Sequence, residues 1–480
     1  MDYNSGLLNT EDDDDQYEDG CSRTLACDPR RKLHRFLVLF FISFLAFGSY
    51  FCFDIPAAMQ DVFIKDLRLD SQKFMNLYSF YSWPNVFVCF IGGFLVDRVF
   101  GLQVGGILFS GLVLIAQVVF GLGTSFNNIP LMYIGRLILG IGGETLATVQ
   151  NAYCISWYSS SEVTFVFGLQ MSIARFGSTV TMNVMMPIYN ALKNSAHFGG
   201  PKVVGYTQFI AALFCLFSML CTIFLAYFDR RSKRILRSTA QAIEVSDHSL
   251  ENEETVKVEE DKIQLKDVLT FPTSYWLICI IIVCYYVSVF PFIGLGVTYF
   301  EKKYGLTPTM AGFVNSLSYI VSAVASPLLG AMIDFTGCNL LWIALSVLLT
   351  LFVHCMFAFN FTVPPLVLMI LLGFGYSILA SIWPLVGLLI PGYQLGTAYG
   401  MLQAVQNLGL AVIAMAAGAI LDSSGYFMVE LFFIAWLVLT LAAVVALYFV
   451  DLSRGSLLNA SGKRRRREAR EREAAANPVN

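Results

Sequence analysis

The chain has 480 residues, of which 56% are hydrophobic and 14% charged, and its formal net charge at pH 7 is −3. Soluble domains carry about 25% charged residues, whereas the mean hydropathy of this chain is +0.65. These values exclude an ordinary soluble globular protein and predict an all-α membrane protein that crosses the bilayer many times.

Residues 1–35 form a polar tail that includes an acidic run from Glu11 to Asp15. A run of like charges is typical of a solvated segment. The tail lacks the apolar core that a cleavable signal peptide requires. We therefore expect the first hydrophobic helix to direct insertion into the membrane.

A helix needs about 20 apolar residues to span the hydrocarbon core of a bilayer. Twelve segments meet this requirement and predict a membrane domain of twelve helices. They cover approximately residues 36–58, 73–96, 104–126, 130–155, 162–190, 205–228, 273–299, 308–333, 340–360, 364–390, 395–421 and 426–450.

Basic residues set the expected orientation, because cytosolic loops carry an excess of Lys and Arg. Basic clusters precede the first expected helix and follow the sixth and the twelfth, whereas the connections 123–130, 360–364 and 421–426 carry no Lys or Arg. Both termini are therefore expected in the cytosol. The chain divides into a cytosolic acidic tail (1–35), an N-terminal six-helix bundle (36–228), a cytosolic linker (229–272), a C-terminal six-helix bundle (273–450) and a cytosolic basic tail (451–480).

The two halves resemble each other. Residues 63–79 align without gaps on residues 300–316, which places Asp70 on Thr307, and both residue types favour the start of a helix. The pattern Gly140-x-Gly142 recurs as Gly373-x-Gly375. Several matches in register indicate an internal duplication. Twelve helices in two parallel repeats are the plan of transporters whose substrate site lies at the midplane between the halves.

Two motifs carry a family likeness. The run Gly93-Phe-Leu-Val-Asp97-Arg98-Val-Phe-Gly101 resembles the loop motif between helices 2 and 3 of the major facilitator superfamily, and Gly330 to Gly337 is a degenerate copy in the expected place. Arg136-x-x-x-Gly140-x-Gly142-Gly143 resembles the helix 4 motif of the same family. After Gly101 the chain departs from the family pattern, because Leu102-Gln103 replaces the usual basic pair. The resemblance implies the major facilitator fold and alternating access.

A closer likeness covers nearly the whole chain. The runs 48–54, 81–85, 289–296 and 394–400 resemble a branch of this superfamily that exports dipeptides from lysosomes. This resemblance implies a multi-pass protein of the lysosomal membrane, dipeptides as substrates, and a heavily glycosylated accessory membrane protein as partner. Leu7 and Leu8 in the acidic tail look like a dileucine sorting signal for lysosomes.

Glu144 and Arg175 are the principal candidates for function. Both lie in long apolar segments, where a charge costs at least a few kcal/mol unless it is paired or faces a cavity. In the repeat alignment they correspond to Ser377 and Asn407, so the fold itself does not require them. A carboxylate can hold the ammonium group of a short peptide, and a guanidinium can bind its carboxylate through two parallel hydrogen bonds. The alternative is a buried salt bridge that only locks two helices together.

The C-terminal half has no comparable charge in midspan and offers aromatic and amide side chains instead. We expect the substrate to be bound by Glu144, Arg175, Tyr286, Asn315, Tyr319, Trp383, Gln403 and Asn407. Gating is expected from Asp97, Arg98, Asp334 and Arg136, with a structural role equally open for Arg136. Asp54 is expected at a helix end or gate, and His354 in a structural role.

The expected function is export of dipeptides by a uniporter with broad side-chain specificity. Two alternatives remain open: a non-transporting sensor or scaffold on the same fold, and a proton-coupled small-solute symporter. A membrane enzyme is disfavoured, because the sequence shows no metal cluster, nucleophile elbow or phosphate loop. We expect no cofactor and no metal, and the lipid bilayer but no nucleic acid among the partners.

Overall fold

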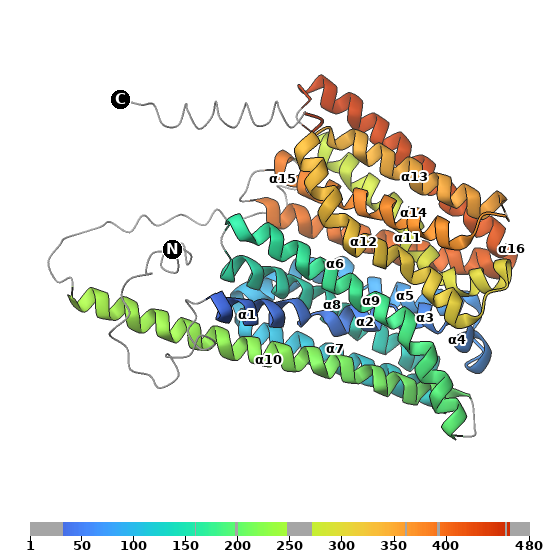
Figure 1. The fold of residues 1–480 in the computed structure, drawn as a ribbon, viewed down its shortest axis with the longest axis horizontal. Helices are drawn as coiled ribbons and strands as arrows, with labels where there is room; N and C mark the ends of the chain where they lie inside the picture. Colours follow the sequence, from blue (N-terminus) through green and yellow to red (C-terminus); the bar gives the residue numbers. More distant parts are fainter. Residues whose placement is uncertain are drawn as a thin grey trace.

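The computed structural model describes residues 32–158, 160–196, 200–246, 271–360, 362–390, 394–456 and 458–460. Helices dominate these residues (Figure 1). The first half contains α1 (Lys32–Phe44), α2 (Phe47–Phe53), α3 (Ile55–Ala58), α4 (Gln60–Asp66), α5 (Ser71–Ser82), α6 (Asn85–Leu95), the π-helix η1 (Val96–Phe100), α7 (Gly101–Ser125), α8 (Ile129–Trp157), α9 (Ser160–Ala196) and α10 (Pro201–Ser246). The second half contains α11 (Thr273–Tyr304), α12 (Pro308–Thr336), α13 (Asn339–Phe359), α14 (Pro365–Leu379), the 3₁₀-helix η3 (Ala380–Leu385), α15 (Val386–Leu389) and α16 (Leu395–Ser453).

Nine helices of the described part are long and apolar enough to cross a membrane. The remaining expected spans have other forms. Residues 73–96 lie in α5 and α6, which Trp83 and Pro84 separate, and residues 162–190 lie in the more polar α9. The last two expected helices are the two arms of α16, which bends at Gly425, where φ is +78°. A positive φ favours glycine, so the bend falls where the sequence permits it.

The first expected helix is divided into three pieces and followed by α4, which sequence reasoning did not foresee. Pro56 lies in the first turn of α3, and a proline has no N–H group for a preceding turn. The break leaves carbonyl groups of α2 without helical partners. The guanidinium of Arg136, from α8, donates to two of them: Nη1 to the carbonyl of Cys52 (3.0 Å) and Nη2 to that of Phe53 (3.2 Å).

The expected helix starts at Asp70 and Thr307 are confirmed. The side chain of Asp70 accepts a hydrogen bond from the backbone N–H of Lys73 (2.6 Å), and that of Thr307 accepts one from Met310 (3.4 Å). The duplicated glycine motifs also correspond in structure, because Gly101 and Gly337 both have a φ of +70° beside a helix end.

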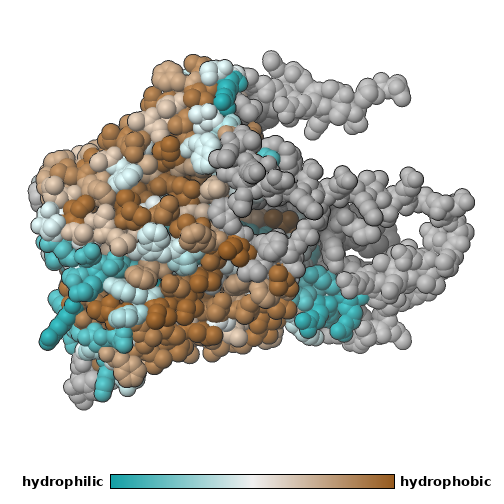
Figure 2. All heavy atoms as spheres, turned by 180° about the vertical axis from the view of Figure 1, so that it is seen from behind, coloured by the Kyte–Doolittle hydropathy of each residue, from teal (hydrophilic) through white to brown (hydrophobic). Residues whose placement is uncertain are grey.

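The helices form two bundles that lie side by side, the first in blue to green and the second in yellow to red (Figure 1). Contacts between the bundles run mainly through α5 with α16 and α9 with α12. A broad apolar band covers the face seen in Figure 2, and hydrophilic residues gather toward its edges. Outward-facing residues such as Phe36, Leu213 and Phe449 are more than half exposed, as expected for side chains that meet lipid.

Candidate functional site

The carboxylate of Glu144 lies at the interface of the two bundles. Tyr81 of α5 donates its hydroxyl to Oε1 (3.3 Å), and Gln403 of α16 donates Nε2 to Oε2 (3.4 Å). Glu144 thus accepts one hydrogen bond from each bundle. Glu144 as a residue is half-buried.

Two glycines of the helix 4 motif allow this placement. A β-carbon at Gly140 would overlap the carbonyl oxygen of Tyr81, and one at Gly143 would overlap the hydroxyl of Ser49 on α2. Only glycine lets the neighbouring helices approach α8 so closely. The glycines therefore serve helix packing, and they bring Tyr81 within hydrogen-bonding distance of Glu144.

Arg175, on α9, also reaches across the interface. Its Nη1 donates to the carbonyl oxygen of Ser322 (2.8 Å) and to the hydroxyl of Ser326, both on α12. Its Cζ lies 5.1 Å from the ring centroid of Tyr376 on α14, a cation–π contact. Neither Nε nor Nη2 donates a hydrogen bond to a described residue, and neither atom is fully buried. These two groups remain available to a ligand.

Glu144 and Arg175 do not form an ion pair with each other among the described contacts. A salt bridge that only locks α8 to α9 is therefore not the arrangement found. Tyr50 of α2 lies close enough to interact electrostatically with Glu144, Tyr376 and Arg175. Sequence reasoning missed Tyr50 as a site residue, although it belongs to the run 48–54 that carries the closer family likeness.

Aromatic side chains of the second bundle form a wall beside Arg175. The rings of Tyr286 and Phe290 stack with centroids 5.2 Å apart, and Tyr376 meets Tyr286 edge-on at 6.1 Å. Trp383 donates Nε1 to the hydroxyl of Tyr286 (3.2 Å), and Tyr399 donates its hydroxyl to the carbonyl of Trp383 (3.0 Å). Tyr286 and Trp383 were expected at the site. Phe290 joins them through the rings of Tyr286 and Tyr376, and Tyr399 joins through Trp383, which lies in the 3₁₀-helix η3.

The amide of Asn315 was expected to bind substrate, and that role stays a prediction. Asn315 is fully buried, and its Nδ2 donates to the carbonyl of Ile293 on α11 (2.9 Å). The same Nδ2 lies 3.8 Å from Sδ of Met182 on α9, so the side chain also touches the first bundle. A β-carbon at Gly296 would overlap Oδ1 of Asn315. The side chain thus ties α12 to α11 at the interface of the two bundles.

Two other expected residues, Asn407 and Tyr319, are buried. Asn407 donates Nδ2 to the carbonyl of Gln403 in its own helix (3.0 Å) and contacts Sγ of Cys89 on α6 (3.9 Å). Tyr319 donates its hydroxyl to Oδ1 of Asp54 (3.2 Å), which joins α12 to the break between α2 and α3. Both residues lie where the bundles meet, but their described partners are groups of the protein itself.

Arg136 is almost fully buried and is held by contacts within the first bundle. Besides its two carbonyl acceptors, its Cζ lies 5.7 Å from the ring centroid of Tyr78 and 5.0 Å from that of Phe120. Asp54 lies close enough to interact electrostatically with it. These contacts favour the structural alternative, in which Arg136 caps the interrupted first helix.

The side chains of Asp97, Arg98 and Asp334 lie outside the described part of the structure, as do Leu7 and Leu8 of the proposed sorting signal. The backbone at Asp97 and Arg98 belongs to η1, and that at Asp334 belongs to α12.

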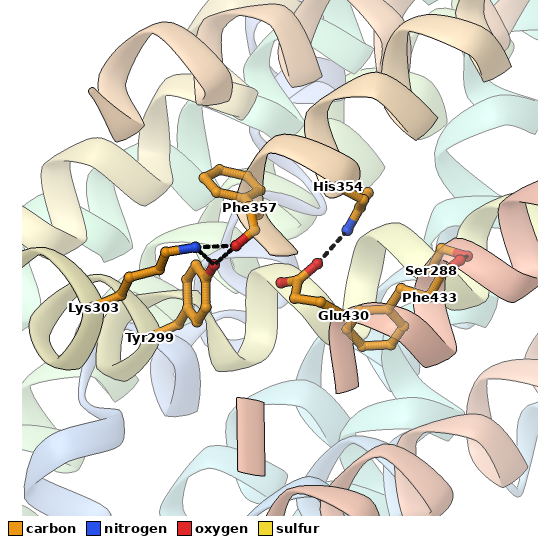
Figure 3. Close-up of polar contacts among 7 residues, drawn as sticks. All are labelled: Ser288, Tyr299, Lys303, His354, Phe357, Glu430 and Phe433. Carbon is orange, nitrogen blue, oxygen red and sulfur yellow. Dashed lines mark hydrogen bonds and ion pairs between the residues drawn. The ribbon is translucent and has the colours of Figure 1, made fainter. Parts of the chain in front are cut away.

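A second acid–base pair lies inside the second bundle (Figure 3). Nδ1 of His354, on α13, lies 2.9 Å from Oε2 of Glu430, on α16, and the two side chains are 0% and 3% exposed. Phe292 and Phe433 enclose the imidazole with ring centroids 4.9 and 5.9 Å away. The expected structural role of His354 agrees with this environment. Sequence reasoning missed Glu430 and counted no comparable buried charge in this half.

Polar groups of α11 extend this cluster. Tyr299 donates its hydroxyl to the carbonyl of Phe357 (2.6 Å), and Lys303 donates to the same carbonyl and to the Tyr299 hydroxyl (Figure 3). Among the described residues, no group of three or more His, Cys, Asp or Glu side chains could hold a metal ion.

Comparisons with known proteins place the chain. The family model described as "Major Facilitator Superfamily" matches residues 39–298 and again residues 277–479. The lysosomal dipeptide transporter MFSD1 of Danio rerio is 48% identical over 97% of this chain and 98% of its own length. The proteins of that name from Mus musculus and Homo sapiens are each 48% identical, over 93% and 92% of this chain and 94% and 91% of their own lengths.

Solved structures share the fold at low sequence identity. A crystal structure of tetrameric PepTSo2 has a TM-score of 0.60 at 16% identity, covering 88% of this chain and 99% of that one. A bacterial homologue of the human lysosomal transporter Spinster has a TM-score of 0.62 at 11% identity, covering 87% and 97%. With two bundles in parallel repeat, a charged interface between them and a family model that matches both halves, this chain belongs to the major facilitator superfamily.

Proposed function

We propose that this protein exports dipeptides from the lysosome to the cytosol by alternating access. The observation that carries the proposal is the arrangement of Glu144 and Arg175. One acid and one base face the same interface, do not pair with each other among the described contacts, and are held by groups of the opposite bundle. The relatives named as lysosomal dipeptide transporters supply the substrate class and the compartment.

A dipeptide at neutral pH carries an ammonium at one end and a carboxylate at the other. Glu144 supplies a charge for the ammonium, and Arg175 presents free Nε and Nη2 donors for the carboxylate. Recognition of the two termini leaves the peptide side chains to the wall of Tyr286, Phe290, Tyr376 and Trp383. A large aromatic wall constrains side-chain identity less than it constrains the termini, which supports broad specificity.

Contacts between the bundles support a lumen-closed conformation. They run from the interface charges toward the end of the bundle opposite the termini. There the backbone N–H of Thr298 donates to Gln60 (3.2 Å), and Asp422 accepts from the backbone N–H groups of Ser71 (2.9 Å) and Gln72 (2.8 Å). The basic clusters place the termini in the cytosol, so this end faces the lumen. Opening it and closing the other end would complete the cycle. Asp97, Arg98 and Asp334 are proposed to act at that cytosolic end, and Arg136 to support the broken first helix.

Uniport is the simplest form of this mechanism. The acid at the interface is Glu144, and its described partners are neutral groups, Tyr81 and Gln403. A proton-coupled symporter would require Glu144 to exchange a proton in each cycle, so it predicts transport driven by a pH gradient. A sensor or scaffold would bind dipeptide without net flux. The family resemblance also implies a heavily glycosylated accessory membrane protein as partner, and it supports Leu7 and Leu8 as the sorting signal.

Counterflow of a labelled dipeptide into liposomes that contain the purified protein tests the proposal. We expect exchange of a neutral dipeptide without a pH gradient. Competition by the same peptide with its amino group acetylated, or with its carboxylate converted to an amide, should be at least about tenfold weaker, because each change removes a charged contact worth about 1.5–3 kcal/mol. Binding without flux would favour the sensor, and flux only with a pH gradient would favour the symporter. Undiminished competition by either capped peptide would contradict the assignment of Glu144 and Arg175.

A further inference from the structure

We infer that Ser326 is a positioning residue: from the second bundle, it aims the guanidinium of Arg175 so that one edge faces the substrate carboxylate. The inference rests on the proposed function and adds Ser326 as the residue that sets the geometry of the site for the substrate carboxylate. It also means that residues of both bundles form this part of the site.

Arg175 holds its hydrogen-bond donors in a fixed geometry. A guanidinium carries five N–H groups in a rigid planar fork. Nη1 holds two of them, and it has two acceptors, the carbonyl oxygen of Ser322 and the hydroxyl of Ser326. A carboxylate can therefore no longer bind across the Nη1–Nη2 end. The remaining edge, formed by Nε and Nη2, presents two parallel N–H groups, which is the geometry for bidentate binding of a carboxylate.

An aromatic ring restrains the guanidinium as well. The ring of Tyr376, on α14, lies 5.1 Å from Cζ of Arg175, a cation–π contact. Two acceptors on α12 hold Nη1, and the ring holds the centre of the group. All these side-chain contacts come from the second bundle, although Arg175 belongs to the first. Arg175 is therefore aimed only while α9 and α12 lie together.

This arrangement links ligand binding to conformation. If the bidentate edge exists only in the conformation with α9 against α12, a dipeptide carboxylate binds that conformation more tightly and stabilises it in return. The interface itself does not depend on Ser326. Ser172 of α9 also donates its hydroxyl to the carbonyl of Ala323 on α12 (3.1 Å), so removal of one hydroxyl leaves a second tie in place.

The chain offers a matched control about two turns away. Ser318 is buried in the same helix, and its hydroxyl donates to the carbonyl of Asn315 within α12 (3.0 Å). Ser318→Ala removes a buried hydroxyl from α12 and keeps both acceptors of Arg175. Ser326→Ala removes the acceptor itself, and Ser326→Thr restores a hydroxyl at the same position.

The test measures the KM and maximal rate of dipeptide counterflow, together with the shift in thermal unfolding that a saturating dipeptide produces. Ser326→Ala should raise KM about five- to tenfold, as expected for loss of part of a charge-assisted hydrogen bond, with the maximal rate within about twofold. Ser318→Ala and Ser326→Thr should stay within about twofold of the unsubstituted protein in KM. In an Arg175→Lys background, which lacks the fork, Ser326→Ala should have less than a twofold further effect on binding, because the two residues act as one unit.

Equal effects of Ser326→Ala and Ser318→Ala would overturn the inference, as would an undiminished effect of Ser326→Ala in the Arg175→Lys background. Those results leave the proposed function standing, because the unsubstituted protein still exchanges dipeptide. Absence of both counterflow and ligand stabilisation in the unsubstituted protein would instead overturn the proposed function and this assignment with it.

Discussion

The molecule holds two acid–base pairs that differ in position, burial and hydrogen-bond partners. Glu144 and Arg175 lie between the bundles, are only partly buried, and bind groups of the opposite bundle. His354 and Glu430 lie inside the second bundle, 2.9 Å apart, with side chains that are 0% and 3% exposed. In the first pair, Nε and Nη2 of Arg175 can still donate hydrogen bonds to a ligand. In the second pair, the rings of Phe292 and Phe433 enclose His354 and keep a ligand away.

This difference indicates that the interface pair serves transport and the buried pair serves stability. A pair buried within one bundle moves with that bundle as a rigid unit, so it contributes equally to every conformation of a transport cycle. A pair that spans the interface changes its surroundings whenever the bundles move. The two pairs should therefore respond oppositely to substitution, the first in transport and the second in stability.

The largest effect is expected at the interface pair. Arg175→Ala should lower dipeptide counterflow by at least about 100-fold, because two charge-assisted hydrogen bonds of about 1.5–3 kcal/mol each are lost. Glu144→Ala should have an effect of the same order. Both variants should unfold at nearly the temperature of the unsubstituted protein. Lys65→Ala, which removes an exposed charge outside the site, is the control and should transport normally. Transport above about a tenth of the normal rate in either site variant would argue against a role in binding.

The buried pair should show the reverse behaviour. Glu430→Ala should destabilise the protein by about 3–5 kcal/mol, because it leaves His354 buried without its partner. Thermal unfolding of the purified protein in detergent measures the loss. The double variant His354→Leu/Glu430→Leu should recover much of it, since an apolar pair of similar volume carries no desolvation penalty. A transport defect in the folded double variant as large as that of Arg175→Ala would remove the distinction between the pairs.

A smaller effect is expected from the packing that positions Glu144. Gly140→Ala should cost about 1–3 kcal/mol of stability, because the new methyl group would overlap the carbonyl of Tyr81 and force α5 away from α8. It should also raise KM, since Tyr81 is a partner of Glu144. Gly111→Ala is the matched control, because a β-carbon at Gly111 meets no atom within 4 Å. Both variants are compared by thermal unfolding and counterflow. Equal stability of the two would show that α8 and α5 can adjust without cost.

The smallest effect is expected at the far end of the interface. Asp422→Asn removes a charge that accepts from the backbone N–H groups of Ser71 and Gln72 at the start of α5. A charge at a helix N-terminus contributes about 0.3–1 kcal/mol, so the balance of conformations should shift by about two- to fivefold toward the lumen-open form. Labelling of a cysteine introduced at Tyr319 by a reagent applied from the lumenal side measures the shift. Asp61→Asn, on the same end but paired with Lys65 inside α4, should leave labelling unchanged.

Hydropathy and spacing in the sequence were sufficient for the fold class. Apolar segments, the register between residues 63–79 and 300–316, and the helix starts at Asp70 and Thr307 report local preferences, and the structure confirms both caps. Glu144 and Arg175 stood out for the same local reason, since a charge in an apolar helix is costly wherever its partners lie. The proposed roles of Asp97, Arg98 and Asp334 stay predictions.

Tertiary contacts decided which residue faces which. Asn315 is tied to Ile293 of its own bundle and also touches Met182 of the other, while Ser326 approaches Arg175 from a distant part of the chain. Glu430, which sequence reasoning missed, became visible only when packing placed it against His354. The physical reason is that the cost of burying a charge can be read from the apolar segment around it. A hydrogen bond needs two groups, and the sequence does not show which distant group will be the partner. The sequence by itself therefore determined the membrane helices and the charges that need explanation, and only the folded chain decided which charges are closed and which remain open to a ligand.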